Sequence, residues 1–432
     1  MKPLTAKINS KGHLEIGKID ALDLAKKHGT PLYVMDVATI KQIVKEYRTL
    51  EKYYPHTRIA FASKALSLTA LYQLLDKEGL YFDVISDGEI FTLLNAGVSL
   101  KKAYFHGNNK TMAEIELALK NEIGCIVVDN SSELKRIKDA YTRLKMKNKI
   151  NILFRVVPEI DAHTHEFIQT GKRDTKFGVL KEQLLDILDE ALKLKIFNFQ
   201  GLHAHIGSQI FDFYPFEVLI ERLFNMCMLI YKEKKIVCTD ISIGGGMGIK
   251  YTREDDPPAI NEFIEAIARK LKAALKENKY PLQPTIILEP GRSIVANAGV
   301  TLYTIGAVKE IPDIRTFLTI DGGMADNPRP ITYGAKYEAD LAGKMKKGKN
   351  KIYSIAGKFC ESGDILIRDI SLPSAEAGDI LAVYATGAYN YSMSSNYNRY
   401  RKPAMVFVEN GKDTLVLKRE TLRDIIRNDV KC

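Results

Sequence analysis

The chain has 432 residues, of which 46% are hydrophobic and 27% charged, a composition typical of a folded protein with a large core and room for two domains. Its net charge of +10 comes without a zinc-finger, RRM or helix-turn-helix motif, which favours a lysine-rich surface over nucleic-acid binding. Five scattered cysteines without a CxxC pair predict reduced thiols and a cytoplasmic protein. We expect neither secretion nor membrane insertion, because the sequence shows no signal-peptide pattern and no long apolar stretch.

Short apolar runs alternate with amphipathic segments from residue 58 onward. The eight runs span residues 58–63, 80–85, 102–107, 124–129, 150–157, 198–206, 240–244 and 285–289. Parallel strands that are buried on both faces have this near-continuous apolar character, so the alternation predicts a (β/α)8 TIM-type barrel over residues 35–293. Within it, Asn130 is a predicted helix N-cap, with Glu133 as its capping-box partner.

The pattern of residue types changes after residue 293. Runs such as VTLYTIGAVKE and DILAVYATG are rich in β-branched and aromatic residues and are separated by Gly, Pro and Asp turns. They predict an all-β domain over residues 294–432. Residues 1–34 are also strand-like and precede the barrel pattern, so we expect them to pair with this domain.

Candidate chemical groups follow the predicted barrel strands, where barrel active sites lie. Lys64 ends the first strand in FASKAL and is suited to a Schiff base, although a surface lysine at a strand end explains it equally well. HAHIGSQ places His203 and His205 on one side of the sixth strand, and no third side chain is as well placed to complete a zinc site. The alternative is that His205 stacks on an aromatic cofactor and Ser208 binds a phosphate, with a structural role open for His203.

Two glycine-containing motifs, IGGGMG and EPGRS, follow the seventh and eighth strands. The loops after these strands form the usual phosphate site of such barrels, and glycines let the backbone approach an anion closely. Glu289 of EPGRS would then lie near the heterocycle of the same ligand, where a carboxylate keeps a pyridine nitrogen protonated. Together with Lys64 and His205, these groups predict pyridoxal 5′-phosphate (PLP) as the cofactor.

The sequence resembles the PLP-dependent decarboxylases that have an alanine-racemase-like barrel, and among them the diaminopimelate decarboxylases. The resemblance rests on motifs that run in order along nearly the whole chain: TPLYVMD, FASKA, FDVISDGEI, HTHEFIQTGKRDTKFG, GLHAHIGSQ, IGGGMGI, LEPGRSIV, DGGMADNPRPITYGA, CESGD and ATGAYNYSMSSNYN. EPGR and HIGS are shared with relatives that cleave ornithine and arginine. Leu66 and Asp87 depart from the family pattern, where many members have Asn and Gly.

The resemblance implies a role for each matched residue. Lys64 would carry PLP and Cys360 would be the proton donor, reaching the site of the other subunit in a homodimer. Cofactor contacts would come from Lys64, His205, Ser208, Gly246, Glu289, Gly291, Arg292 and Tyr389. Substrate contacts would come from Arg292, Arg329, Tyr333, Glu361 and Tyr389. No metal is implied.

The implied reaction is the decarboxylation of meso-2,6-diaminopimelate to L-lysine, the last step of lysine biosynthesis. This substrate has an amino acid head at each end, so its site must bind a distal carboxylate and a distal ammonium. Arg292 and Arg329 suit the carboxylate, and Glu361 suits the ammonium. A thiol at Cys360 suits protonation after carbon dioxide leaves. Alternatives are a decarboxylase of arginine, ornithine or carboxynorspermidine, or a non-catalytic regulatory homologue, which should have lost Lys64 or Cys360.

Overall fold

The computed structural model describes residues 1–160 and 175–432 and divides the chain into two compact units. The barrel unit comprises Val44–Gly248 and Pro257–Gly291, and the β unit comprises Met1–Ile43, Ile249–Asp256 and Arg292–Cys432. The domain limits drawn from the sequence stay a prediction, and the contacts group 249–256 with the β unit although the sequence pattern assigns it to the barrel. Most of the motif HTHEFIQTGKRDTKFG lies outside the described residues.

The barrel unit contains the predicted closed barrel of eight parallel strands, so the expectation of a (β/α)8 barrel is confirmed. The strands are β5 (Thr57–Ala62), β6 (Tyr81–Val84), β7 (Ala103–Phe105), β8 (Cys125–Val128), β9 (Ile150–Arg155), β10 (Phe197–His203), β11 (Asp240–Ser242) and β12 (Thr285–Leu288). They pair in chain order, and β12 closes the barrel on β5. Their near-continuous apolar sequences fit burial on both faces.

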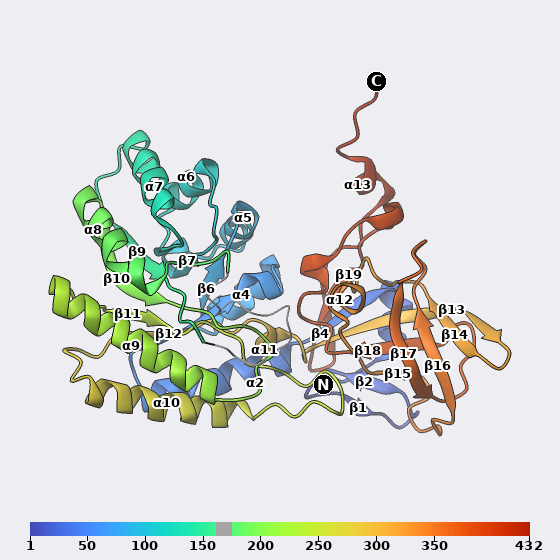
Figure 1. Cartoon of the computed structure of the whole chain (residues 1–432). Coiled ribbons are helices and arrows are strands. Elements are labelled where there is room, and N and C mark those ends of the chain that lie inside the picture. The colour runs from blue at the N-terminus through green and yellow to red at the C-terminus, as the bar shows by residue number, and fades with distance from the viewer. Residues whose placement is uncertain (161–174) are drawn as a thin grey trace. The chain divides into compact units, whose positions relative to one another are not determined.

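Helices surround this barrel (Figure 1). The helical segments from residue 37 to residue 277 are α2 (Val37–Arg48), α3 (Leu50–Tyr53), η1 (Ser63–Ala65), α4 (Thr69–Lys77), α5 (Asp87–Asn95), η2 (Leu100–Lys102), α6 (Met112–Lys120), α7 (Ser131–Arg143), η3 (Lys181–Gln183), α8 (Leu184–Leu194), α9 (Tyr214–Lys234) and α10 (Ile260–Glu277). In α10 the buried residues Phe263, Ile267 and Leu271 recur at a spacing of four and form the buried apolar stripe of the helix. In the part of the chain that the structure describes, no helix is both long and apolar enough to cross a membrane.

The start of α7 differs in one respect from the predicted capping box. The side chain of Asn130 accepts a hydrogen bond from the Glu133 amide, as expected of an N-cap. The carboxylate of Glu133 instead accepts a hydrogen bond from the Asp129 amide at 2.9 Å and pairs with Lys110 at 2.6 Å. Because the Glu133 side chain is fully buried, its charge requires a cation, and Lys110 supplies it.

The buried pair gives a prediction for stability. Lys110→Met is expected to lower the free energy of unfolding by about 3–5 kcal/mol, because it leaves Glu133 buried without a counter-charge. Urea unfolding measures the change, and Lys120→Met, at an exposed lysine on α6, is the control. The double variant Lys110→Met/Glu133→Leu should recover much of the loss. If the double variant is no more stable than Lys110→Met, the loss of stability does not come from the unpaired charge of Glu133.

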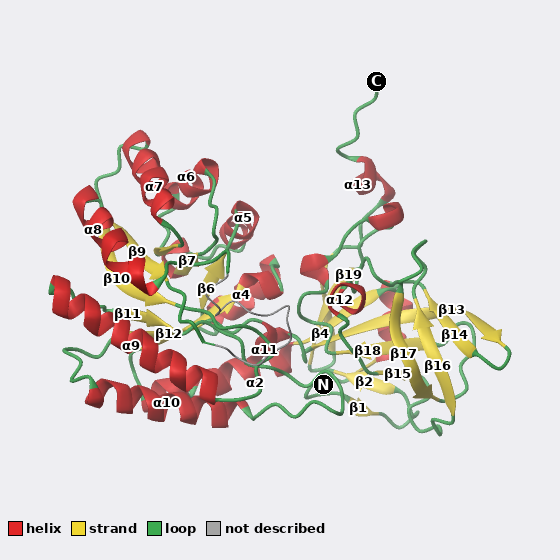
Figure 2. Ribbon diagram, in the orientation of Figure 1, coloured by secondary structure: helices red, strands yellow, loops and turns green. Residues whose placement is uncertain are grey.

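The β unit is built on a nine-stranded sheet (Figure 2). Its strands are β4 (Leu32–Asp36), β13 (Gly299–Ile311), β14 (Arg315–Ile320), β15 (Ala339–Leu341), β16 (Lys351–Ala356), β17 (Ile365–Leu372), β18 (Ile380–Tyr384), β19 (Ala404–Glu409) and β20 (Lys412–Leu417). The N-terminal strand β4 lies between β13 and β19, antiparallel to the first and parallel to the second.

The remaining N-terminal segment packs on the same unit. It forms a separate sheet of β1 (Lys7–Ile8), β2 (Leu14–Ile16) and β3 (Ile19–Asp20), followed by α1 (Ala21–His28). Leu14, Ile16 and Leu24 join the core of the sheet beside Val300 and Val406. The other helical segments of the unit are short: α11 (Arg292–Val295), α12 (Arg329–Tyr333), η4 (Tyr391–Met393), η5 (Tyr397–Arg399) and α13 (Leu422–Ile426).

Candidate active site

A cavity of about 360 Å³ lies in the barrel unit, at the ends of the parallel strands. Its polar lining includes Lys64, Asp83, His106, Arg155, His203, His205 and Glu289. Each of these residues lies within two residues of the end of a barrel strand, which is where barrels place their chemical groups. Of the residues predicted from the sequence, Lys64, His205 and Glu289 meet in this cavity.

Glu289 lies at the centre of a buried hydrogen-bonded group. Its carboxylate pairs with His203 Nε2 at 2.9 Å and accepts a hydrogen bond from Ser242 Oγ at 2.7 Å. Burial alone would raise the pKa of Glu289, but the neighbouring His203 and His106 and these two hydrogen bonds outweigh it, so the pKa lies below its usual range. The site therefore holds a buried carboxylate in its ionised form.

His205 and Lys64 bring the complementary groups to the cavity. Burial, followed by the charges of Lys64 and Arg155, holds the pKa of His205 well below its usual value, so the ring is neutral. A neutral imidazole offers a flat face for stacking. Lys64 lies in η1, directly after β5, with an exposed side chain, so its amine is accessible to a ligand in the cavity.

The structure adds polar residues that the sequence reasoning missed. Asp83 and His106 are buried, and His106 Nε2 lies 3.7 Å from Asp83 and 3.6 Å from Glu289. Burial and the charge of Glu289 raise the pKa of Asp83 well above its usual value. The sequence carried a signal for them, since each is a charged or titratable residue within an apolar run: Asp83 in LYFDVI, His106 in KAYFHG and Arg155 in INILFRVV.

The absence of a metal site at the pair of His203 and His205 stays a prediction, although His203 lies close to two other potential ligands without His205. His106, His203 and Glu289 bring potential ligand atoms within 4.8 Å of one another, a group that could hold a metal ion. These residues come from three different strands, so their proximity was invisible in the local motif HAHIGSQ. The distance of 2.9 Å between His203 and Glu289 is that of a hydrogen bond.

The loops that carry the predicted phosphate ligands are packed closely. Ile210 and Met247 form a bridge between the loops after β10 and β11. Gly246 has φ of +128°, and a Cβ there would meet the Gly207 carbonyl oxygen at 2.5 Å. At Gly291 a Cβ would meet the Ala62 side chain at 2.9 Å. Both positions therefore require glycine, and Ser208 lies half-buried in the same loop as Gly207.

The other predicted residues belong to the β unit, where two arginines lie among tyrosines. Arg292 lies over the ring of Tyr389 at 4.7 Å, and Tyr389 has φ of +59° in the loop after β18. Arg329, at the start of α12, is buried and donates to the hydroxyl of Tyr337 at 2.9 Å. Tyr333, at the end of the same helix, is 52% exposed. The unit thus gathers Arg292, Arg329 and Tyr389 around aromatic residues.

Cys360 and Glu361 lie exposed in the turn between β16 and β17. The Cys360 amide donates to Asn398 Oδ1 at 2.9 Å. Asp364 fixes the turn by accepting hydrogen bonds from the amides of Phe359 and Met324 at 3.0 and 2.7 Å. The conformation of CESGD therefore depends on its buried aspartate, while its thiol and first carboxylate face outward.

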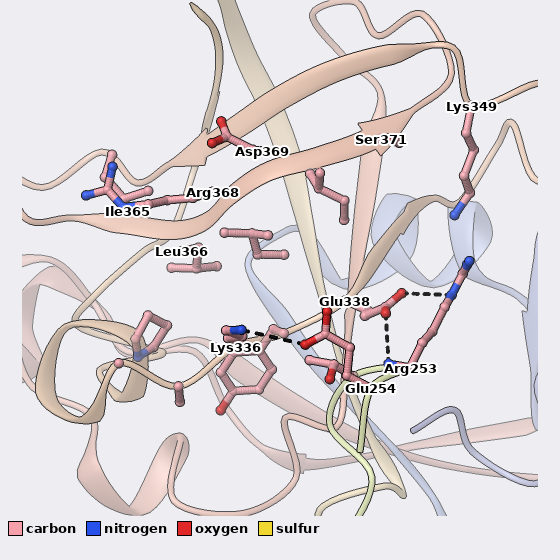
Figure 3. A pocket seen from close by; sticks show the side chains of 17 residues that line it. Arg253, Glu254, Lys336, Glu338, Lys349, Ile365, Leu366, Arg368, Asp369 and Ser371 are labelled. Atoms are coloured by element: carbon pink, nitrogen blue, oxygen red, sulfur yellow. Dashed lines mark hydrogen bonds and ion pairs between the residues drawn. The ribbon is translucent and has the colours of Figure 1, made fainter. Parts of the chain in front are cut away.

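A larger, open cavity of about 630 Å³ lies elsewhere in the β unit (Figure 3). Charged residues on its rim pair with each other, Arg253 with Glu338 at 3.3 Å and Lys336 with Glu254 at 3.7 Å. None of the residues predicted to bind cofactor or substrate lines it. It supplies no group that the predicted chemistry requires.

Comparison with known proteins places these features in context. Residues 40–296 match the family model described as pyridoxal-dependent decarboxylase, pyridoxal binding domain. The diaminopimelate decarboxylase of Bacillus methanolicus is 47% identical over 97% of each chain, and that of Bacillus subtilis is 45% identical over 99% of this chain and 97% of the relative. A crystal structure of the M. jannaschii diaminopimelate decarboxylase in complex with L-lysine matches with a TM-score of 0.92 and 35% identity, over 100% of this chain and 99% of that one.

Proposed function

Because the chain belongs to the diaminopimelate decarboxylase family, we propose that Lys64 carries the cofactor and that the side chains around it serve the decarboxylation of meso-2,6-diaminopimelate. The protein is a PLP-dependent decarboxylase that converts diaminopimelate to lysine and carbon dioxide. The observation that carries the assignment of roles is the barrel cavity, in which an accessible amine, a neutral imidazole and an ionised buried carboxylate meet.

The amine, imidazole and carboxylate that meet in the barrel cavity fit the chemical groups of PLP. When bound, PLP withdraws electrons from the bond that breaks at the α-carbon. Lys64 would hold the aldehyde carbon, His205 the face of the ring, and Glu289 the ring nitrogen, whose proton its ionised carboxylate stabilises. The remaining contacts to the cofactor, mainly to its phosphate, are assigned to Ser208, Gly246, Gly291, Arg292 and Tyr389.

Substrate recognition is assigned to the β unit. The guanidinium groups of Arg292 and Arg329 would form bidentate pairs with the distal carboxylate, and the carboxylate of Glu361 would bind the distal ammonium. Tyr333 and Tyr389 complete the set of substrate contacts. The identity of the substrate as the meso stereoisomer is part of this proposal.

Cys360 is assigned to proton donation, in a cytoplasmic homodimer whose subunits share their active sites. A thiol at this position would protonate the α-carbon after carbon dioxide has left. The exposure of Cys360 and Glu361 on their turn supports the idea that a second copy of the chain covers them, because a proton donor must be shielded from water while it acts.

The proposal is tested by measuring carbon dioxide and amine products from meso-diaminopimelate, L-ornithine and L-arginine in parallel, with purified protein loaded with PLP. Lysine from diaminopimelate alone is the expected result. Release only from ornithine or arginine would overturn the substrate assignment. No release from any of the three, while the cofactor stays bound, would overturn the substrate assignment and favour carboxynorspermidine as the substrate or a non-catalytic regulatory role.

Arg329→Ala gives a second test of the substrate assignment. The change is expected to raise KM for meso-diaminopimelate by about 100-fold, because a charge pair with the distal carboxylate is lost. Arg329→Lys should recover only part of the loss, since an ammonium cannot form the bidentate pair. Steady-state kinetics measure both, and Arg368→Ala, at an exposed arginine of β17, is the control. An unchanged KM in Arg329→Ala would contradict the role.

A further inference from the structure

One tyrosine of the β unit contacts both arginines that the proposed function assigns to the substrate. Arg292 Nη1 donates to the hydroxyl of Tyr251 at 2.6 Å, and the Arg329 guanidinium lies over the Tyr251 ring at 4.7 Å. Tyr251 itself is only 6% exposed. The tyrosine side chain, which has only two rotatable torsions, therefore links Arg292 to Arg329.

The surroundings of Tyr251 hold this link in place. Its amide donates to Asp255 Oδ2 at 2.9 Å, which closes a turn within the segment Ile249–Asp256. The next residues of the segment are tied to β-unit residue Glu338, which accepts a hydrogen bond from the Arg253 amide at 3.0 Å and pairs with its side chain, as Figure 3 shows. The backbone that carries Tyr251 is thus fixed to the same unit as the arginines.

Tyr337 completes the support of Arg329. The rings of Tyr251 and Tyr337 meet edge to face at 5.5 Å and 85°, and the Tyr337 hydroxyl accepts a hydrogen bond from Arg329 Nη1. Arg329 is only 8% exposed, and within residues 1–160 and 175–432 it forms no ion pair with a carboxylate. A buried guanidinium that is supported by neutral groups keeps its full charge and most of its five donors for an anion.

We infer that Tyr251 is a positioning residue that sets the spacing and orientation of Arg292 and Arg329, and that it thereby determines selectivity for substrates with a distal carboxylate. This inference rests on the proposed function, which assigns the two arginines to that carboxylate. A phenol suits the task because it orients a guanidinium through its oxygen and its ring face without neutralising the charge. An acidic side chain in its place would compete with the substrate for both arginines.

Two substitutions separate the two contacts of Tyr251. Tyr251→Phe removes the hydrogen bond to Arg292 and keeps the ring under Arg329, whereas Tyr251→Leu removes both. We expect KM for meso-diaminopimelate to rise about tenfold in the first variant and about 100-fold in the second, since hydrogen bonds and ring contacts to a charged group are lost. In both, kcat and cofactor content should stay within about twofold of the wild type. Tyr353→Phe, which removes another buried tyrosine hydroxyl of the β unit, is the matched control.

A merely structural role for Tyr251 would not change the selectivity for a distal carboxylate. The product L-lysine keeps that carboxylate and cadaverine has none, so the ratio of the inhibition constant of cadaverine to that of L-lysine should fall in both variants and stay constant in Tyr353→Phe. Equal weakening of both inhibitors, or unchanged inhibition, would overturn the inference and leave Tyr251 as a packing residue.

A binding measurement separates failure of this inference from failure of the proposed function. Calorimetric titration of the PLP-loaded protein with glutarate, a dicarboxylate that cannot react, reports on the arginine pair whatever the true substrate. Weaker binding by about tenfold in Tyr251→Phe supports the inference even if the wild type does not act on diaminopimelate. Equal affinity of glutarate for the wild type and both variants, or no binding to any of them, would overturn it.

Discussion

Lys64→Ala is expected to abolish turnover and to remove the visible absorbance of covalently bound PLP. The amine of Lys64 lies in the cavity beside His205 and Glu289, and alanine cannot form the bond to the cofactor aldehyde. Loss of covalent catalysis and of the positioned amine should lower kcat by at least about 10³-fold. The side chain is exposed, so its removal should leave the fold intact.

Two companion variants make this result specific. Lys64→Arg keeps a positive charge in the cavity but cannot bond to the aldehyde, so it should be as inactive as the alanine variant. Lys101→Ala, at an exposed lysine paired with Glu122 on the same unit, should behave as the wild type. Normal absorbance and turnover in Lys64→Ala would show that another amine carries the cofactor.

The barrel could be predicted from the sequence because its strands are local and uniform in character. Each of the eight apolar runs corresponds to an observed strand, from β5 (Thr57–Ala62) to β12 (Thr285–Leu288). A strand buried on both faces needs no alternation, so short runs bounded by polar turns were sufficient. The order of the second sheet was not predictable in this way. There β4 pairs with β13 and β19, far along the chain, and only tertiary packing selects these partners.

The site residues that stand in a sequence motif could be predicted, whereas single residues that only the fold brings together could not. Lys64 and Glu289 stand in recognisable motifs, whereas Asp83 and His106 are isolated polar residues within short apolar runs. Their meeting depends on closure of the barrel, which brings strand ends together that are distant in sequence. The same holds for Glu133, whose partner Lys110 lies on another loop and displaced the capping box that the local pattern predicted.

Cys360→Ala is expected to keep the cofactor and lose most of its turnover. The residue lies on an exposed turn of the β unit, so the barrel cavity and its absorbance should not change. Removing a general acid lowers kcat by about 10²–10⁴-fold. Cys360→Ser should be intermediate, because a hydroxyl is a weaker acid than a thiol. Cys432→Ala, at the other exposed cysteine, is the matched control and should leave turnover unchanged. Wild-type kcat in Cys360→Ala would rule out its proton-donor role.

Mixing the two inactive variants tests whether the thiol acts in the other subunit's site. A symmetric dimer formed from one Lys64→Ala chain and one Cys360→Ala chain would have one site with both residues intact and one with neither. Random re-association should therefore restore about one quarter of wild-type activity if Lys64 and Cys360 of different chains work together. If both act within one chain, every site in the mixture lacks one of them, and activity stays at the level of the separate variants. Restored activity would thus establish both the dimer and the sharing of its sites, because neither alone can produce it.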